Sequence, residues 1–125
     1  MPIPDLLVKH VDCLRNEGYE VSIIDGPEIC IIIKNYPIPD KIWSQDKVEL
    51  LLIAYPSYPN AKMDMFWVNP IITLKNKNPP QSTGLTSKCE RNWLQFSWHV
   101  NSWNPATDNL ITYLDVVNDR LRRAQ

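Results

Sequence analysis

The sequence predicts an α+β domain in which helices lie on an antiparallel sheet. Three observations predict it: apolar residues repeat at helical spacing near each end of the chain, four apolar segments of strand character lie between, and turn signals separate these segments. The chain has 125 residues, of which 44% are hydrophobic, and this is enough for one buried core. We therefore expect residues 1–125 to form a single domain.

The first predicted helix covers residues 4–17. Pro4 suits a first helical turn, and Gly18 suits a helix end. Apolar and half-apolar side chains recur on one face of this segment, as an amphipathic helix requires. The residues on this face are Leu6, Leu7, His10, Val11 and Leu14.

Four strands are predicted to follow as an antiparallel meander. Residues 19–39 predict two strands around a turn, because Asp25-Gly26 is a strong hairpin signal. Residues 47–56 predict a third strand that is apolar enough to lie in the middle of the sheet. Residues 64–74 predict a fourth, in which Pro70 requires a sheet edge or a bulge.

Residues 75–89 predict a long loop, since they are polar, rich in proline, glycine, serine and threonine, and lack periodicity. Loops of this length are uncommon unless they have a function. The alternation over residues 93–98 permits a short strand after the loop. The last helix is predicted within residues 103–124, with an apolar stripe of Leu110, Tyr113, Leu114, Val117 and Leu121. Its candidate N-caps are Thr107 and Asp108.

Charge and composition exclude several classes of function. The formal net charge is −1, and the only basic cluster is Arg120, Arg122 and Arg123, which favours a helix C-terminus over nucleic-acid binding. No apolar run approaches the roughly 20 residues that cross a bilayer, and the first residues lack a secretion signal. Three cysteines without regular spacing predict neither a disulfide framework nor a zinc site. A reducing cytoplasm is the simplest compartment.

The order of the motifs resembles the ubiquitin-conjugating enzyme family. Tyr55-Pro56 ends the third strand, Asp64-Met65-Phe66 begins the fourth, and a long loop then holds Cys89. "WNPATDNL" at residues 103–110 is similar to the Trp-x-Pro motif that precedes a helix in that family. More narrowly, the chain resembles a bacterial branch, prokaryotic family E, in which a Trp/Ser/His cluster follows; here it is Trp93, Ser97 and His99.

The resemblance implies a role in a bacterial ubiquitin-like conjugation pathway. Its implied partners are a ubiquitin-like modifier, an adenylating activating enzyme and a metal-dependent deconjugating protease. The implied reaction transfers the modifier to a cysteine as a thioester and then to an amine. No cofactor is expected on this chain, because the activating enzyme uses the ATP.

Cys89 is the predicted acyl carrier. An acyl carrier needs an exposed thiolate, and Lys88 and Arg91 supply positive charge beside it. Cys13 and Cys30 lie among apolar residues and are expected to be small buried side chains. The alternative is that Cys89 is a loop cysteine without a catalytic role.

His99 is the second candidate catalytic residue. It is a candidate to lower the thiol pKa or to accept a proton from the incoming amine, and the alternative is a structural histidine that fixes the loop. Asp108 is a candidate to orient His99 or to cap the last helix, and we favour the cap. A zinc site at Cys89 and His99 is disfavoured because no convergent set of four ligands is evident.

One departure from the family pattern, together with two further questions, leaves alternatives open. Ubiquitin-conjugating enzymes carry His-Pro-Asn before the cysteine, and here Asn78-Pro79 is the nearest equivalent. The oxyanion donor is therefore a backbone N–H, Asn78 or Asn101. The tryptophans of residues 93–103 are expected to be core side chains, with a recognition surface as the alternative. The rival functions are a non-catalytic binding module on the same fold and an unrelated small interaction protein.

Overall fold

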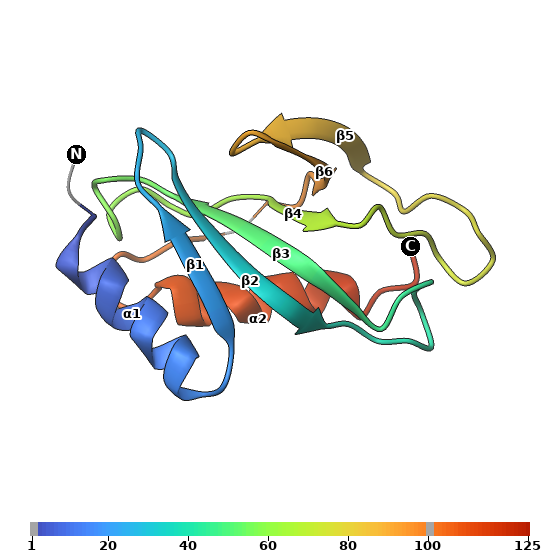
Figure 1. Ribbon diagram of the computed structural model, residues 1–125, viewed down its shortest axis with the longest axis horizontal. Helices are drawn as coiled ribbons and strands as arrows, with labels where there is room; N and C mark the ends of the chain where they lie inside the picture. The colour runs from blue at the N-terminus through green and yellow to red at the C-terminus, as the bar shows by residue number, and fades with distance from the viewer. Residues whose placement is uncertain (1–2, 100–101) are drawn as a thin grey trace.

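The computed structural model describes residues 3–99 and 102–125. Both helices lie on the same side of an antiparallel sheet (Figure 1), which confirms the α+β class with one helix near each end of the chain. The elements in chain order are α1 (Asp5–Asn16), β1 (Glu20–Ile24), β2 (Ile29–Pro37), β3 (Lys47–Ala54), β4 (Phe66–Asn69), β5 (Thr83–Lys88), β6 (Arg91–Phe96) and α2 (Leu110–Leu121).

The sheet has six strands in the order β1-β2-β3-β4-β6-β5, rather than the four expected. The meander of β1 to β4 is as predicted, and the Asp25-Gly26 turn joins β1 to β2. β4 ends at Asn69, well before residue 74, because Pro70 has no N–H to donate to a neighbouring strand. The additional strands are β5 and β6, and β5 lies inside the segment that was expected to be a loop.

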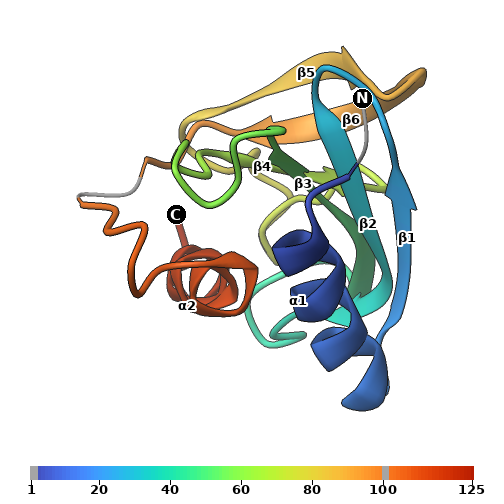
Figure 2. The same ribbon diagram turned by 90° about the vertical axis from the view of Figure 1, so that its left-hand side faces the viewer.

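The main core lies between the sheet and the helices. Alternate residues of β2 point to this side, so Ile29, Ile31 and Ile33 are fully buried. Figure 2 shows α1 and α2 on this face of the sheet. Each helix buries one stripe of mainly apolar residues. The buried residues of the two helices are Leu7, Val11, Leu14, Leu110, Tyr113, Leu114, Val117, Arg120 and Leu121.

A second, smaller cluster lies on the opposite face of the sheet. Its buried members, called the outer cluster below, are Cys30, Ile32, Leu51, Ile53, Trp67 and Trp93. Met65 and Cys89 pack against it. β2 therefore buries both faces, because Cys30 and Ile32 alternate with the residues of the main core.

The last helix begins later than predicted, and its N-cap is a different residue. The side chain of Asn109 accepts hydrogen bonds from the N–H groups of Ile111 and Thr112, and the N–H of Asn109 donates to the hydroxyl of Thr112. The prediction that Asp108 caps this helix is therefore wrong. Its carboxylate instead accepts a hydrogen bond from the N–H of Asn104 at 2.8 Å. The tight bend at Asn104 places Asp108 one residue short of the cap position.

The tryptophans serve mainly as core side chains. Trp93 is 1% exposed in the outer cluster, and Trp43 donates its indole N–H to the carbonyl of Leu121 at 2.7 Å. Arg120, expected near the helix C-terminus, is buried, and its guanidinium donates to the carbonyls of Gln81 and Gln125. Neither described helix has the length and apolar composition that crossing a membrane requires.

Candidate functional site

Cys89 lies in the turn of the β5–β6 hairpin. Lys88 and Arg91 are the last paired residues, so Cys89 and Glu90 alone form the connection. Their φ values are +53° and +61°. Two consecutive residues in the left-handed region are typical of the tight turn that matches the twist of a hairpin. Cys89 is therefore held at the end of a regular element and not in an irregular loop.

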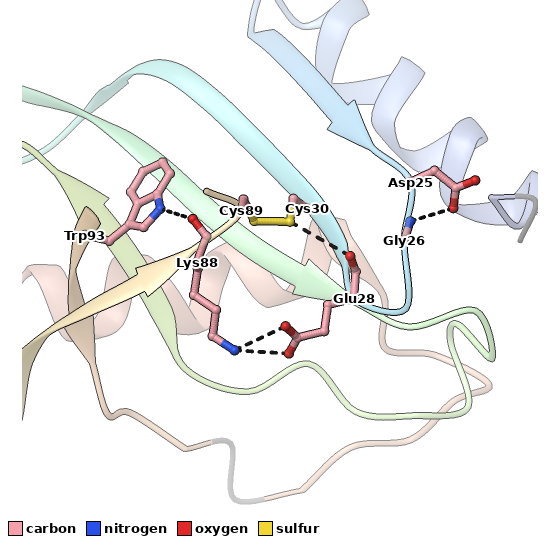
Figure 3. Close-up of a disulfide and its surroundings, with 7 residues drawn as sticks. All are labelled: Asp25, Gly26, Glu28, Cys30, Lys88, Cys89 and Trp93. Carbon is pink, nitrogen blue, oxygen red and sulfur yellow. Dashed lines mark hydrogen bonds and ion pairs between the residues drawn. A yellow bond between two sulfur atoms is a disulfide. The ribbon is translucent and has the colours of Figure 1, made fainter. Parts of the chain in front are cut away.

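Cys89 forms a disulfide with Cys30 of β2 (Figure 3), with a Cα–Cα distance of 6.5 Å. The expectation that the cysteines form no disulfide is therefore wrong. The two residues are 59 positions apart, and β3, β4 and β6 separate their strands in the sheet. They meet because the hairpin arches over the outer face, to which Cys30 points. Only a thiolate attacks a thioester, so Cys89 has no nucleophilic sulfur while this bond exists.

The third cysteine also differs from expectation. Cys13 is exposed and free on α1, although its apolar neighbours suggested burial. The buried stripe of α1 is Leu7, Val11 and Leu14, and Cys13 lies on the other side of the helix. Cys30 is buried as predicted, at 6% exposure, but as half of a disulfide.

The cations beside Cys89 are paired with carboxylates. The ammonium of Lys88 lies 3.1 and 3.2 Å from the two carboxylate oxygens of Glu28 (Figure 3). The guanidinium of Arg91 donates to Glu49 at 2.6 Å, and this bond holds the pKa of Glu49 below its usual value. The positive charge that was expected to favour a thiolate is thus largely balanced by these acids.

A cavity of about 360 Å³ borders the disulfide. One wall is the β1–β2 turn, including Gly26, Pro27 and Glu28, and the other is Cys89 with Glu90. Trp93 donates its indole N–H to the carbonyl of Lys88 at 2.9 Å, which fixes the end of β5 over the outer cluster. The sulfur atoms are therefore reached from a small cleft between two rigid turns.

His99 lies beyond the other end of β6 and does not contact Cys89. β6 has six residues, and an extended strand of that length spans about 20 Å. The structure therefore does not bring the two predicted catalytic residues together.

The partner of His99 is Asp64, and not Asp108. The Nδ1 atom of His99 lies 2.9 Å from Oδ2 of Asp64. The His99 side chain is 63% exposed, and the Asp64 side chain is 26% exposed. Asp64 Oδ1 is buried and has no hydrogen-bond partner among residues 3–99 and 102–125. The half-buried carboxylate thus directs its Oδ2 atom at the imidazole.

Asp64 was in the "Asp-Met-Phe" motif but was not predicted to contact His99. The contact follows from the register of β4 and β6, in which Phe66 pairs with Phe96. The N–H of Met65 extends this pairing by donating to the carbonyl of Trp98 at 3.0 Å. The two segments continue side by side beyond this bond, and this brings residue 64 close to residue 99. The sequence indicates this contact only through the spacing of the two motifs. That spacing can be interpreted only when the pairing of β4 with β6 is known.

His99 lines a broad polar cavity of about 980 Å³ between the end of β6 and α2. Hydroxyls of Ser82, Ser97 and Ser102 border it, and Asp115 and Arg122 contribute charges from α2. When Nδ1–H is donated to Asp64, Nε2 is the nitrogen of the neutral ring that can accept a proton. The arrangement has the chemistry of a histidine base beside a polar cleft.

The candidate oxyanion donor Asn78 does not lie beside Cys89. Asn78 lies in the exposed loop before β5, where its carbonyl accepts a bond from the N–H of Leu74, whereas Cys89 follows the other end of β5. Asn101 lies outside the described residues. Within the described ranges, no three His, Cys, Asp or Glu side chains gather as a metal site would require.

Comparison with protein families gives one match. The profile described as Prokaryotic E2 family E matches residues 6–124, which include nearly all of α1, the whole sheet and all of α2. Searches of curated proteins and of solved structures found no match. The matched range contains Cys30, Cys89, Asp64 and His99, so every residue of the sites described above lies within it.

Proposed function

This chain belongs to Prokaryotic E2 family E, and from that membership we propose that it accepts a ubiquitin-like modifier as a thioester on Cys89. At the level of the family, membership supports a role related to ubiquitin conjugation, with transferase activity and binding of a modifier and its activating enzyme. The assignment to Cys89 is the finer step. It applies to the chain in which the Cys30–Cys89 disulfide has been reduced.

The proposed reaction has two transfers. The Cys89 thiolate attacks the carbonyl carbon that joins the modifier's C-terminal glycine to the activating enzyme's cysteine. A carbon–sulfur bond forms at Cys89, and the activating enzyme's sulfur leaves as a thiolate. An acceptor amine then attacks the new thioester, the amide bond forms, Cys89 leaves as a thiolate, and the amine loses a proton.

The observation that carries the proposal is the position of Cys89 at the end of a hairpin, on the rim of the 360 Å³ cavity. A two-residue turn holds the sulfur there with little freedom, and transfer chemistry benefits from a fixed nucleophile. Cys30 is 6% exposed inside the outer cluster. Cys13 is exposed on α1, but it borders none of the cavities described above.

His99 has no direct part in this step in the present arrangement. It was predicted to assist the proton transfer, but about 20 Å of strand lies between it and Cys89. We propose that the Asp64–His99 pair acts in the polar cavity beside α2. There it would contact a bound partner, either as a base or as a hydrogen-bonding group.

A second function is favoured by one specific observation. Cys89 is bonded to Cys30 and its neighbouring cations are balanced by Glu28 and Glu49. A protein that only holds the modifier or the activating enzyme needs no free thiolate, and a disulfide there simply fixes the hairpin on the sheet. The binding module is thus the alternative that the experiment must separate from the carrier.

The test is adduct formation on a non-reducing gel. The chain is reduced, freed of reductant and mixed with the pathway's modifier, activating enzyme and ATP. We expect a thiol-sensitive adduct that disappears in Cys89→Ser and persists in Cys13→Ser and Cys30→Ala. Cys30→Ala is the sharpest control, because it leaves Cys89 unable to re-form the disulfide. Loss of the adduct only in the Cys13 or Cys30 variant would identify a different thiol, and binding without any adduct would establish the module.

A further inference from the structure

We propose that the Cys30–Cys89 disulfide is a reversible switch that decides whether a Cys89 thiolate exists in the folded protein. The consequence for modifier transfer rests on the proposed function above. The redox change itself involves only the two sulfur atoms, so it can be tested without any partner protein.

Each cysteine is held in place by contacts that do not need the disulfide. Cys30 pairs with Ile24 of β1 and with Ile53 of β3, in the interior of the meander. Cys89 is fixed by the ladder of β5 and β6, which runs without a break from residues 83 and 96 to residues 88 and 91. Reduction therefore leaves both thiols in elements that remain folded.

Two further contacts hold the β5–β6 hairpin against the sheet near β2, as the disulfide does. The Lys88–Glu28 ion pair joins the residue before Cys89 to a residue two positions before Cys30. The ammonium of Lys88 also lies 5.7 Å from the centre of the Trp67 ring in the outer cluster. These contacts keep the hairpin against β2 after the sulfur–sulfur bond opens, so the thiols remain neighbours and can re-form the bond.

The disulfide is accessible to a reductant from one side. Both cysteines line the 360 Å³ cavity, and Cys89 is half-buried whereas Cys30 is 6% exposed. Attack is therefore expected at Sγ of Cys89. Accessible disulfides are more often the labile or regulatory ones.

The reductant is a dithiol, such as a protein with two neighbouring cysteines or dithiothreitol. One of its thiolates attacks Sγ of Cys89, a mixed disulfide forms, and Cys30 leaves as a thiolate that takes up a proton. The second thiol of the reductant then attacks the mixed disulfide and releases Cys89. Two electrons pass to the protein, two protein thiols appear, and the reductant becomes a disulfide.

The first experiment measures the switch alone in the Cys13→Ser variant, which retains only Cys30 and Cys89. The protein is equilibrated with mixtures of reduced and oxidised dithiothreitol, and a portion of each sample is labelled with iodoacetamide in denaturant so that the buried Cys30 thiol is also counted. Mass spectrometry counts the labels, and near-UV circular dichroism reports the fold. We expect two labels to appear together while the folded spectrum is retained, and to disappear after re-oxidation. Labels that appear only as the folded spectrum is lost would overturn the proposal and identify a structural cross-link.

The second experiment couples the switch to transfer. Adduct formation is measured for wild type and Cys30→Ala in an oxidising buffer and in a buffer reduced with a phosphine, which contains no thiol that would cleave a thioester. We expect oxidised wild type to lose the adduct and Cys30→Ala to retain it in both buffers. An equal loss in both proteins would place the sensitivity in the activating enzyme and overturn control by the disulfide. If labelling is reversible but neither reduced protein forms an adduct, the proposed function is contradicted. The reversible opening of the disulfide is then still supported.

Discussion

Nδ1 of His99 lies 2.9 Å from Oδ2 of Asp64, across the ends of two paired strands. The contact joins the residue two positions before β4 to the residue three positions after β6. Tyr113 of α2 fixes the same segment by donating its hydroxyl to the carbonyl of Met65 at 2.7 Å. The carboxylate of Asp64 contributes, after burial, to raising the pKa of Tyr113. Sheet and helix together therefore set the position of the acid that orients the imidazole.

Asp64→Asn is expected to change the tautomer of His99. The carboxylate only accepts hydrogen bonds, so it selects the form with the proton on Nδ1, whereas an amide offers both a donor and an acceptor. Nitrogen chemical shifts of the imidazole report the tautomer directly. The second histidine, His10, serves as the reference within the same spectrum.

Asp108→Asn is the matched control, because Asp108 accepts from the backbone of Asn104 and does not contact His99. We expect its His99 signals to equal those of wild type. Unchanged signals in Asp64→Asn would show that the carboxylate does not determine the tautomer.

Glu90→Gly is expected to stabilise the protein. Glu90 is exposed and has a φ of +61° in the hairpin turn. The left-handed conformation costs a residue with a Cβ about 1–2 kcal/mol, while glycine loses about 0.5–1 kcal/mol of chain entropy on folding. The net gain expected is thus about 0.5–1 kcal/mol, measured by urea unfolding of the oxidised protein.

Glu90→Ala separates backbone strain from side-chain effects, since it removes the carboxylate and keeps the Cβ. We expect its unfolding free energy to stay close to that of wild type. An equal gain in the alanine variant would assign the effect to the lost charge and contradict the account of the turn.

The sequence contains strong local signals for the first half of the sheet. Asp25-Gly26 predicted the β1–β2 hairpin, because glycine accepts the unusual backbone angles of a tight turn. Helical spacing predicted the face of α1 on which Leu7, Val11 and Leu14 are buried, although Leu6, also expected on that face, is 42% exposed. These features depend on residues only a few positions apart in the chain, so the sequence alone is enough to predict them.

The candidate site depends on contacts that a linear reading does not contain. Cys89-Glu90 carries no turn signature, so β5 was hidden in a segment that looked like a loop, whereas the alternation over residues 93–98 had permitted a short strand that overlaps β6. The disulfide needs both the outward direction of Cys30 and the arch of the hairpin. Asp64 and His99 meet only through the register of β4 and β6. In each case, the decisive fact is a strand pairing between segments far apart in sequence.

The last prediction concerns a hydrogen-bonded chain that joins both helices. The N–H of Leu110, at the start of α2, donates to the hydroxyl of Tyr58 at 2.6 Å. That hydroxyl lies 2.7 Å from Nδ1 of His10 on α1. With its oxygen accepting from Leu110, the hydroxyl can donate its own hydrogen to Nδ1 when that nitrogen carries no proton, as in neutral His10. Burial lowers the pKa of His10 below 6.5 and raises that of Tyr58 to about 12.

A lowered pKa of a histidine in the folded state makes stability depend on pH in one direction. The unfolded chain binds the proton more readily, so the contribution of His10 is fully present above pH 6.5 and is lost as pH falls through the folded pKa. We expect the unfolding free energy of wild type to decrease over this range more than that of His10→Gln, which keeps an acceptor but does not titrate. Urea unfolding at several pH values measures both. Parallel curves for the two proteins would show that His10 is not held neutral, and that the bond to Tyr58 does not require its unprotonated nitrogen.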